Sequence, residues 1–125
     1  MCNNMSLVKI LKPDFTFSDD RGNITQICSG GYRQINSVFS KKGAVRGGGH
    51  YHKYNSEAFF IVSGQIELRL SRDGISEKYI FSGGDMFEIA PETRHSFLYL
   101  ADTYLVGLYS GSVILPDGTK DIFTD

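Results

Sequence analysis

The sequence of 125 residues is long enough for one domain with a single hydrophobic core. Hydrophobic residues make up 41% and charged residues 22% of the chain, a balance typical of folded globular proteins rather than disordered ones. The formal net charge of -1, with no run of lysine or arginine, disfavours a protein that binds nucleic acid by neutralising its phosphates.

The sequence has no apolar run of membrane-spanning length, and its first twenty residues contain no apolar segment that reads as a signal peptide. Cys2 and Cys28 are too few for a disulfide framework. We therefore expect a cytoplasmic protein, not bound to membranes, in which both cysteines are reduced thiols.

Short apolar runs broken by turn residues predict an all-β fold. No window shows sustained helical periodicity, and glycine turns fall between the runs, as at Asp73-Gly74 and Gly83-Gly84. Many short strands at even spacing indicate a β-sandwich or β-barrel. The predicted strands, in chain order, are Leu7–Leu11, Asn23–Ser29, Gln34–Ser40, Ala58–Ser63, Gln65–Ser71, Lys78–Phe81, Met86–Ala90, Ser96–Leu100, Tyr104–Ser110 and Val113–Leu115.

We find no repeat and no linker, so we expect one domain over residues 1–125. The strand Gln65–Ser71 alternates strictly between polar and apolar residues, as a half-buried strand does. The residues expected in the barrel interior or in an interface are Phe59, Ile61, Leu68, Leu70, Phe87, Ile89, Phe97 and Leu105.

The segment from His50 to Glu57 is the strongest candidate for a functional site. In an extended strand His50 and His52 point to the same face, and a short loop then brings in Glu57 at the start of the next strand. Two imidazoles and a carboxylate converging on one point suit a divalent metal such as zinc, iron, manganese or nickel. His95 is a fourth candidate ligand further along the chain.

The spacing His-x-His-x4-Glu-x6-Gly over residues 50–64, followed by Gly84, Pro91 and His95, resembles the two motifs of the cupin superfamily. The resemblance implies a double-stranded β-helix, or jelly-roll barrel. It also implies that the metal ligands are His50, His52, Glu57 and His95. Thr93 and Tyr99 stand where the family usually has glycine and asparagine. Some cupins have lost the metal and use the histidines as bases, so a metal-free pocket is the alternative.

Three further segments resemble the nucleotide-sugar 3,5-epimerases, which act on dTDP-4-keto-6-deoxyhexoses. They are the segment 17–23 with its Asp-x-Arg-Gly pattern, the segment 42–51 and the pair His95-Ser96-Phe97 and Asp102-Thr103. Residues 49–64 are also similar to the C-terminal zinc cupin domain of bifunctional capsular-polysaccharide enzymes that epimerise and reduce UDP-sugars. These resemblances imply an epimerase or isomerase of a nucleotide-activated keto sugar, with zinc as the expected metal. They also imply a homodimer, in which the segment Leu7–Leu11 is the candidate contact.

By the same resemblance His50 matches the histidine that acts as the base in the metal-free epimerases. A histidine that binds metal cannot also take a proton, and the base would then be a metal-bound hydroxide or a tyrosine. Tyr109 lies near the position of the acid tyrosine of those enzymes, but one residue late, so it faces the site only if a β-bulge intervenes. Tyr99 and Tyr104 are the alternatives.

Arg21 and Arg46 are candidate ligands for a sugar-nucleotide diphosphate, because a guanidinium fork matches phosphate oxygens. The alternative for Arg21 is a surface salt bridge with a neighbouring aspartate. The run Gly47–Gly49 is unsuited to an ordinary strand and favours a bulge or a close approach of backbone to a ligand. Two other functions share the ligand set: a non-catalytic sugar-binding module with a structural metal, and an iron dioxygenase.

Overall fold

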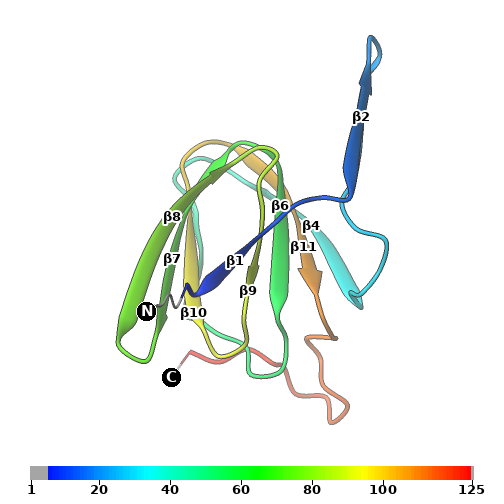
Figure 1. Cartoon of the computed structure of the whole chain (residues 1–125). Helices are drawn as coiled ribbons and strands as arrows, with labels where there is room; N and C mark the ends of the chain where they lie inside the picture. Colours follow the sequence, from blue (N-terminus) through cyan, green and yellow to red (C-terminus); the bar gives the residue numbers. More distant parts are fainter. Residues whose placement is uncertain (1–5, 125) are drawn as a thin grey trace, which may run out of the picture.

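The computed structural model describes residues 6–124 (Figure 1). Cys2 lies outside this range, and Cys28 is a half-buried free cysteine. No described residue belongs to a helix long and apolar enough to cross a membrane. The described strands are β1 (Val8–Leu11), β2 (Phe15–Asp19), β3 (Gly22–Gln26), β4 (Gln34–Ser40), β5 (Val45–His50), β6 (Glu57–Ser63), β7 (Gln65–Arg72), β8 (Ile75–Ser82), β9 (Met86–Ile89), β10 (Arg94–Tyr99) and β11 (Thr103–Tyr109).

Two antiparallel sheets face each other across the core (Figure 1). One has five strands in the order β1-β9-β6-β11-β4, and the other has four in the order β5-β10-β7-β8. This double-sheet architecture confirms the predicted all-β jelly roll. β1 forms one edge of the five-stranded sheet, as expected of the Leu7–Leu11 segment.

Strict alternation along the strands creates the core. In β10 the side chains of His95, Phe97 and Tyr99 are buried, while the residues between them are partly exposed. All eight residues predicted from the pattern belong to one buried cluster. Each large apolar side chain removed from water there contributes about 1.5–3 kcal/mol to folding.

A second buried cluster lies on the outer face of the five-stranded sheet. It contains Ala58 and Phe60 of β6, with Met86 and Leu108, and the segment that follows β3 covers it through Ile27, Cys28 and Tyr32. This cover explains why the residues of β6 are buried on both faces and read as one continuous apolar run.

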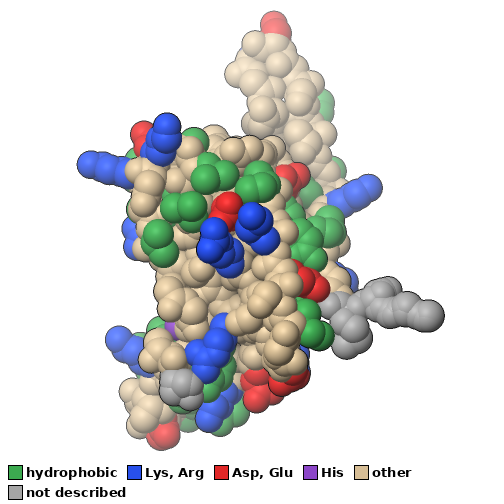
Figure 2. All heavy atoms as spheres, turned by 90° about the vertical axis from the view of Figure 1, so that its left-hand side faces the viewer, with side chains coloured by type: hydrophobic (Ala, Val, Ile, Leu, Met, Phe, Trp, Pro, Cys, Tyr) green, Lys and Arg blue, Asp and Glu red, His purple; other side chains and the backbone are tan. Residues whose placement is uncertain are grey.

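Strands β2 and β3 form a hairpin that projects from the body of the barrel (Figures 1 and 2). The sequence pattern missed β2, and it predicted a longer β3, because the hairpin buries almost nothing and so lacks a core-facing stripe. Phe15, Phe17 and Ile24 are about half to two-thirds exposed on it. An isolated two-stranded hairpin of this kind is only marginally stable in water.

The run Gly47–Gly49 belongs to the strand β5, but not as an ordinary strand, because the register against β10 is irregular at these glycines, as the expected bulge requires. β5 forms because it pairs with β10, a strand distant in the sequence, and such a contact cannot be predicted from local strand propensity. One other prediction was wrong. Residues 113–115 are not a strand, and only the isolated bridge between Ile114 and Lys120 forms there.

Candidate functional site

The four predicted metal-binding residues meet at one end of the barrel. β5 ends at His50 and pairs with the start of β10, where His50 lies opposite His95. β6 begins at Glu57, which lies opposite Tyr109 at the end of β11. His52 is in the loop between β5 and β6. His52, Glu57 and His95 are each 3–4% exposed, and His50 is half-buried.

The imidazole rings are packed closely. The ring centroid of His50 lies 4.6 Å from that of His95 and 5.2 Å from that of His52. One ring nitrogen from each of the three histidines lies within 4.8 Å of the others. Oε1 of Glu57 lies 2.8 Å from Nε2 of His52 and 3.2 Å from Nε2 of His95.

The outer nitrogen of each ring faces a backbone carbonyl. Nδ1 of His52 bonds to the carbonyl of Asp121, Nδ1 of His95 to the carbonyl of Thr93 at 3.2 Å, and His50 to the carbonyl of Gly47. A carbonyl only accepts hydrogen bonds, so these nitrogens carry the protons. The inner nitrogens of neutral rings are then lone pairs that point at one another and at the carboxylate.

Tyr109 also belongs to the site: like Glu57 it comes from the five-stranded sheet, which faces His50 and His95 of the four-stranded sheet. It lines a cavity of about 140 Å3 together with His50, Glu57 and His95. β11 pairs with β4 without a register shift from Thr103 to Tyr109, so Tyr109 shares the inner face of Leu105 by simple alternation. The register shift against β6 places its extra residue in β6, and no bulge in β11 is needed. Of the alternatives, Tyr104 is half exposed, whereas Tyr99 is buried and also lines the cavity.

Residues 38–108 match the cupin domain family, Cupin_2. The chain belongs to the cupin family. No curated protein matches the sequence of this cupin.

Several solved structures share the fold. The sugar 3,4-ketoisomerase QdtA of Thermoanaerobacterium thermosaccharolyticum, in complex with TDP, is 16% identical, with a TM-score of 0.79 over 98% of this chain and 90% of that one. The dTDP-4-dehydrorhamnose 3,5-epimerase of Sulfolobus tokodaii is 24% identical, with a TM-score of 0.75 over 93% and 77%. The 3'-monoepimerase ChmJ of Streptomyces bikiniensis, in complex with dTDP-quinovose, is 20% identical, with a TM-score of 0.75 over 98% and 71%.

The donor set of this cupin fits a divalent metal. Nε2 of His52 and Oε1 of Glu57 are buried and have no hydrogen-bond partner, although they lie 2.8 Å apart. Two such acceptors side by side repel each other unless a cation or a proton lies between them. Imidazole ligands whose outer nitrogens donate to backbone carbonyls, together with a carboxylate ligand, are typical of zinc and of related first-row metals.

A proton takes the same place when no metal is bound. Burial opposes the charged form of His52, but the contact with Glu57 outweighs it and raises the pKa of His52. Burial also opposes the charged form of Glu57, yet the neighbouring His52 and His95 hold its pKa below the usual value. Burial lowers the pKa of His95, and burial with the two neighbouring histidines lowers the pKa of His50 to about 4.

Arg21 and Arg46, the two candidate diphosphate ligands, lie in different parts of the fold. Arg46 lines the cavity and donates from Nε to Oγ of Ser40 at 2.7 Å. Arg21 lies in the turn of the projecting hairpin, away from the C-terminal tail that borders the histidines (Figure 1), and pairs with Asp19 at 2.6 Å. The surface salt bridge expected as the alternative for Arg21 is therefore present.

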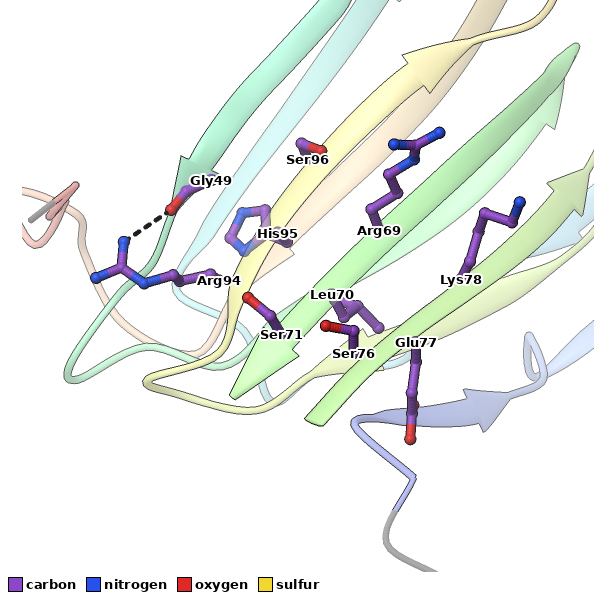
Figure 3. Close-up of a pocket in the computed structure, with 10 residues that line it drawn as sticks. All are labelled: Gly49, Arg69, Leu70, Ser71, Ser76, Glu77, Lys78, Arg94, His95 and Ser96. Atoms are coloured by element: carbon purple, nitrogen blue, oxygen red, sulfur yellow. Dashed lines mark hydrogen bonds between the residues drawn. The ribbon is translucent and has the colours of Figure 1, made fainter. Parts of the chain in front are cut away.

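A more spacious hollow lies elsewhere, on the outer face of the four-stranded sheet. It measures about 560 Å3 and is bordered by Arg69, Lys78 and Arg94 (Figure 3). It is open to solvent and lined mainly by outward-facing residues of β7, β8 and β10. The chemistry-bearing groups converge in the smaller inner cavity, which we therefore take as the candidate site.

Sequence reasoning missed one residue of this site. Asp121 is fully buried and its carbonyl binds the ring of His52, although it belongs to the tail after the last strand. No motif marks it, and the only signal is an acidic residue directly before the pair Ile122-Phe123.

Proposed function

We propose that this cupin is an epimerase or isomerase of a nucleotide-activated keto sugar. The observation that carries the proposal is the placement of a neutral histidine, His50, and a protonated tyrosine, Tyr109, on facing sheets around one cavity. The three fold neighbours support it, since all are named as isomerases or epimerases of sugars and two are in complex with TDP or a dTDP-sugar.

Epimerisation next to a ketone removes a proton from one face of a carbon and returns a proton to the other face. His50 is neutral at pH 7 because its pKa is lowered to about 4, so it has a lone pair free to accept the proton. Burial and the negative charge of Glu57 raise the pKa of Tyr109, so its hydroxyl stays protonated and can donate. A base on β5 and an acid on β11 act from opposite sides of a bound sugar.

We propose that His52, Glu57 and His95 hold a divalent metal, most suitably zinc, and that His50 is the base rather than a permanent ligand. His52 and His95 contact Glu57 directly and all three are buried, whereas His50 is the half-buried member of the cluster. A metal in this position would act as a Lewis acid on the ketone oxygen and stabilise the negative charge of the enolate. Loss of zinc in His50→Ala would instead identify His50 as a fourth ligand.

The cavity of about 140 Å3 is small for a whole nucleotide sugar, since pockets for ligands of that size are usually about 300–1,000 Å3. We therefore propose that only the sugar ring enters, and that Arg46 at the cavity wall binds the diphosphate. Arg21 can reach a phosphate only in a second copy of the chain. We propose a homodimer in which the apolar face of the β2–β3 hairpin packs against that copy.

Solvent deuterium exchange tests the reaction directly. The protein is incubated in D2O with dTDP- and UDP-4-keto sugars, and incorporation of deuterium next to the ketone is followed by NMR. We expect exchange with at least one substrate, its loss in His50→Asn, and its retention in Tyr104→Phe, a control on the outer surface. Absence of exchange with every such sugar contradicts the proposal, and tight binding without exchange would favour a sugar-binding module.

A further inference from the structure

The C-terminal tail after β11 turns back beneath the histidine cluster, and Asp121 is its fully buried residue. Oδ1 of Asp121 accepts the backbone N–H of Lys53 at 2.8 Å, and Oδ2 accepts those of Tyr54 and Asn55, both at 3.1 Å. The side-chain amide of Asn55 adds a bond at 2.9 Å. The carboxylate therefore fixes the loop that joins His52 to Glu57.

The backbone of Asp121 binds the histidine itself, because its carbonyl accepts the Nδ1–H of His52. The same stretch of tail is held in place from both sides. The N–H of Asp121 donates to the carbonyl of Val113 at 2.8 Å, and Tyr51 and Phe123 exchange two backbone bonds of 2.9 and 3.0 Å. One residue thus fixes both the orientation of the His52 ring and the loop that leads to Glu57.

We propose that Asp121 is a positioning residue that keeps Nε2 of His52 aimed at Glu57 and thereby sets the metal affinity of the site. The inference rests on the proposed metal site. A metal-binding histidine is oriented by the hydrogen bond of its other nitrogen, and loss of such a partner typically lowers metal affinity about 10–100-fold. Here the carboxylate acts through the loop and the tail, so it never contacts the metal itself.

Zinc affinity of Asp121→Ala tests the proposal, with Asp117→Ala as the matched control. Asp117 is in the same tail and carries the same charge, but it is exposed and bonds only to the nearby Thr119. We expect zinc affinity to fall about 10–100-fold in Asp121→Ala, to fall less in Asp121→Asn, which retains one acceptor oxygen, and to stay unchanged in Asp117→Ala. Equal affinities in all of these proteins would overturn the proposal.

General loss of stability is separated from positioning by Met86→Ala, which removes a buried side chain on the outer face of the five-stranded sheet. We expect this variant to unfold at a lower temperature with zinc affinity intact. If it loses as much affinity as Asp121→Ala at equal stability, Asp121 has no specific role.

A second readout does not depend on metal. In the metal-free wild-type protein, 15N NMR of the imidazole nitrogens should find the neutral form of His52 protonated at Nδ1, and in Asp121→Asn this tautomer should be mixed. A His52 ring protonated only at Nε2 in the wild type would overturn the proposal. If the wild type binds no zinc, the proposed metal site fails, while the tautomer of His52 still decides the role of Asp121.

Discussion

Nε2 of His52 lies 2.8 Å from Oε1 of Glu57, and neither atom has a hydrogen-bond partner. Both atoms are buried, so they cannot form hydrogen bonds with bulk water. Leaving two such groups unsatisfied costs about 1–3 kcal/mol each, and a bound cation removes this cost. A proton shared by the two groups removes it too, and the raised pKa of His52 with the lowered pKa of Glu57 favours that proton when no metal is bound. The pair is therefore suited to hold either a proton or the proposed metal.

Glu57→Gln is expected to lower bound zinc by at least about tenfold, because it removes the only carboxylate from the set while keeping its shape. His52→Ala should have a similar effect. Elemental analysis of the purified proteins measures it, with Glu67→Gln as the control, since Glu67 pairs with Arg69 on the outer face of β7. Stoichiometric zinc in both site variants would contradict the ligand assignment.

The acid limb of kcat/KM is expected near pH 4 rather than near pH 6.5. His50 must be neutral to accept a proton, and its pKa is lowered to about 4 by burial and by the two other histidines. A metal ion nearby would lower this pKa further, so the direction is the same with zinc bound. Rates measured upward from pH 4, with zinc content checked at each point, should rise only up to about pH 5 and then stay level through pH 6.5, and a limb at 6.5 would exclude His50 as the base.

Tyr109→Phe should separate proton removal from proton return. We expect net epimerisation to fall about 100–10,000-fold, the usual worth of a general acid, while His50 still exchanges the substrate proton with solvent. Deuterium incorporation into unreacted substrate, compared with product formation, measures the two steps. Loss of exchange and product to the same extent would show that Tyr109 is not a separate acid.

The core could be predicted from the sequence because it follows from local spacing, whereas the grouping of His50, His52, Glu57 and His95 came from the resemblance to the cupin motifs. Alternation with a period of two places Phe97 and Tyr99 inside with His95, and the same rule places His50 and His52 on one side of the chain. These predictions need no knowledge of distant contacts. The pairing of β5 with β10 and of β6 with β11 then brings the histidines, Glu57 and Tyr109 together.

The features that the sequence did not predict depend on distant contacts. Asp121 acts on residues 66 to 69 positions away in the chain. The projection of the hairpin, which takes Arg21 away from the cavity, is set by how residues 27–32 cover the outer sheet face. No local periodicity encodes the position of Asp121 or of the hairpin, and a motif match at Arg21 therefore does not show whether this residue lies at the cavity.

Gly47→Ala is expected to destabilise the protein by about 2 kcal/mol. Gly47 has a φ of 92°, and a Cβ there would lie 2.9 Å from the backbone oxygen of His95. Gly48→Ala is the control, because its φ of 53° suits a left-handed residue and nothing lies within 4 Å of the added atom. It should cost about 1 kcal/mol. Chemical denaturation measures both, and equal losses would show that contact with β10 does not limit this position.

Phe17→Ser should shift the protein from dimer to monomer. Phe17 lies opposite Ile24 in the hairpin and both are more than half exposed in the single chain, so the substitution removes interface surface without opening a cavity in the core. Analytical ultracentrifugation at several protein concentrations measures the change, with Ile75→Ser as the control, since Ile75 is an exposed apolar residue at the β7–β8 turn. The same mass for Phe17→Ser and wild type would exclude the hairpin as the dimer contact. A wild-type monomer would leave Arg21 with no phosphate within reach, and Arg21→Ala should then have unaltered substrate affinity.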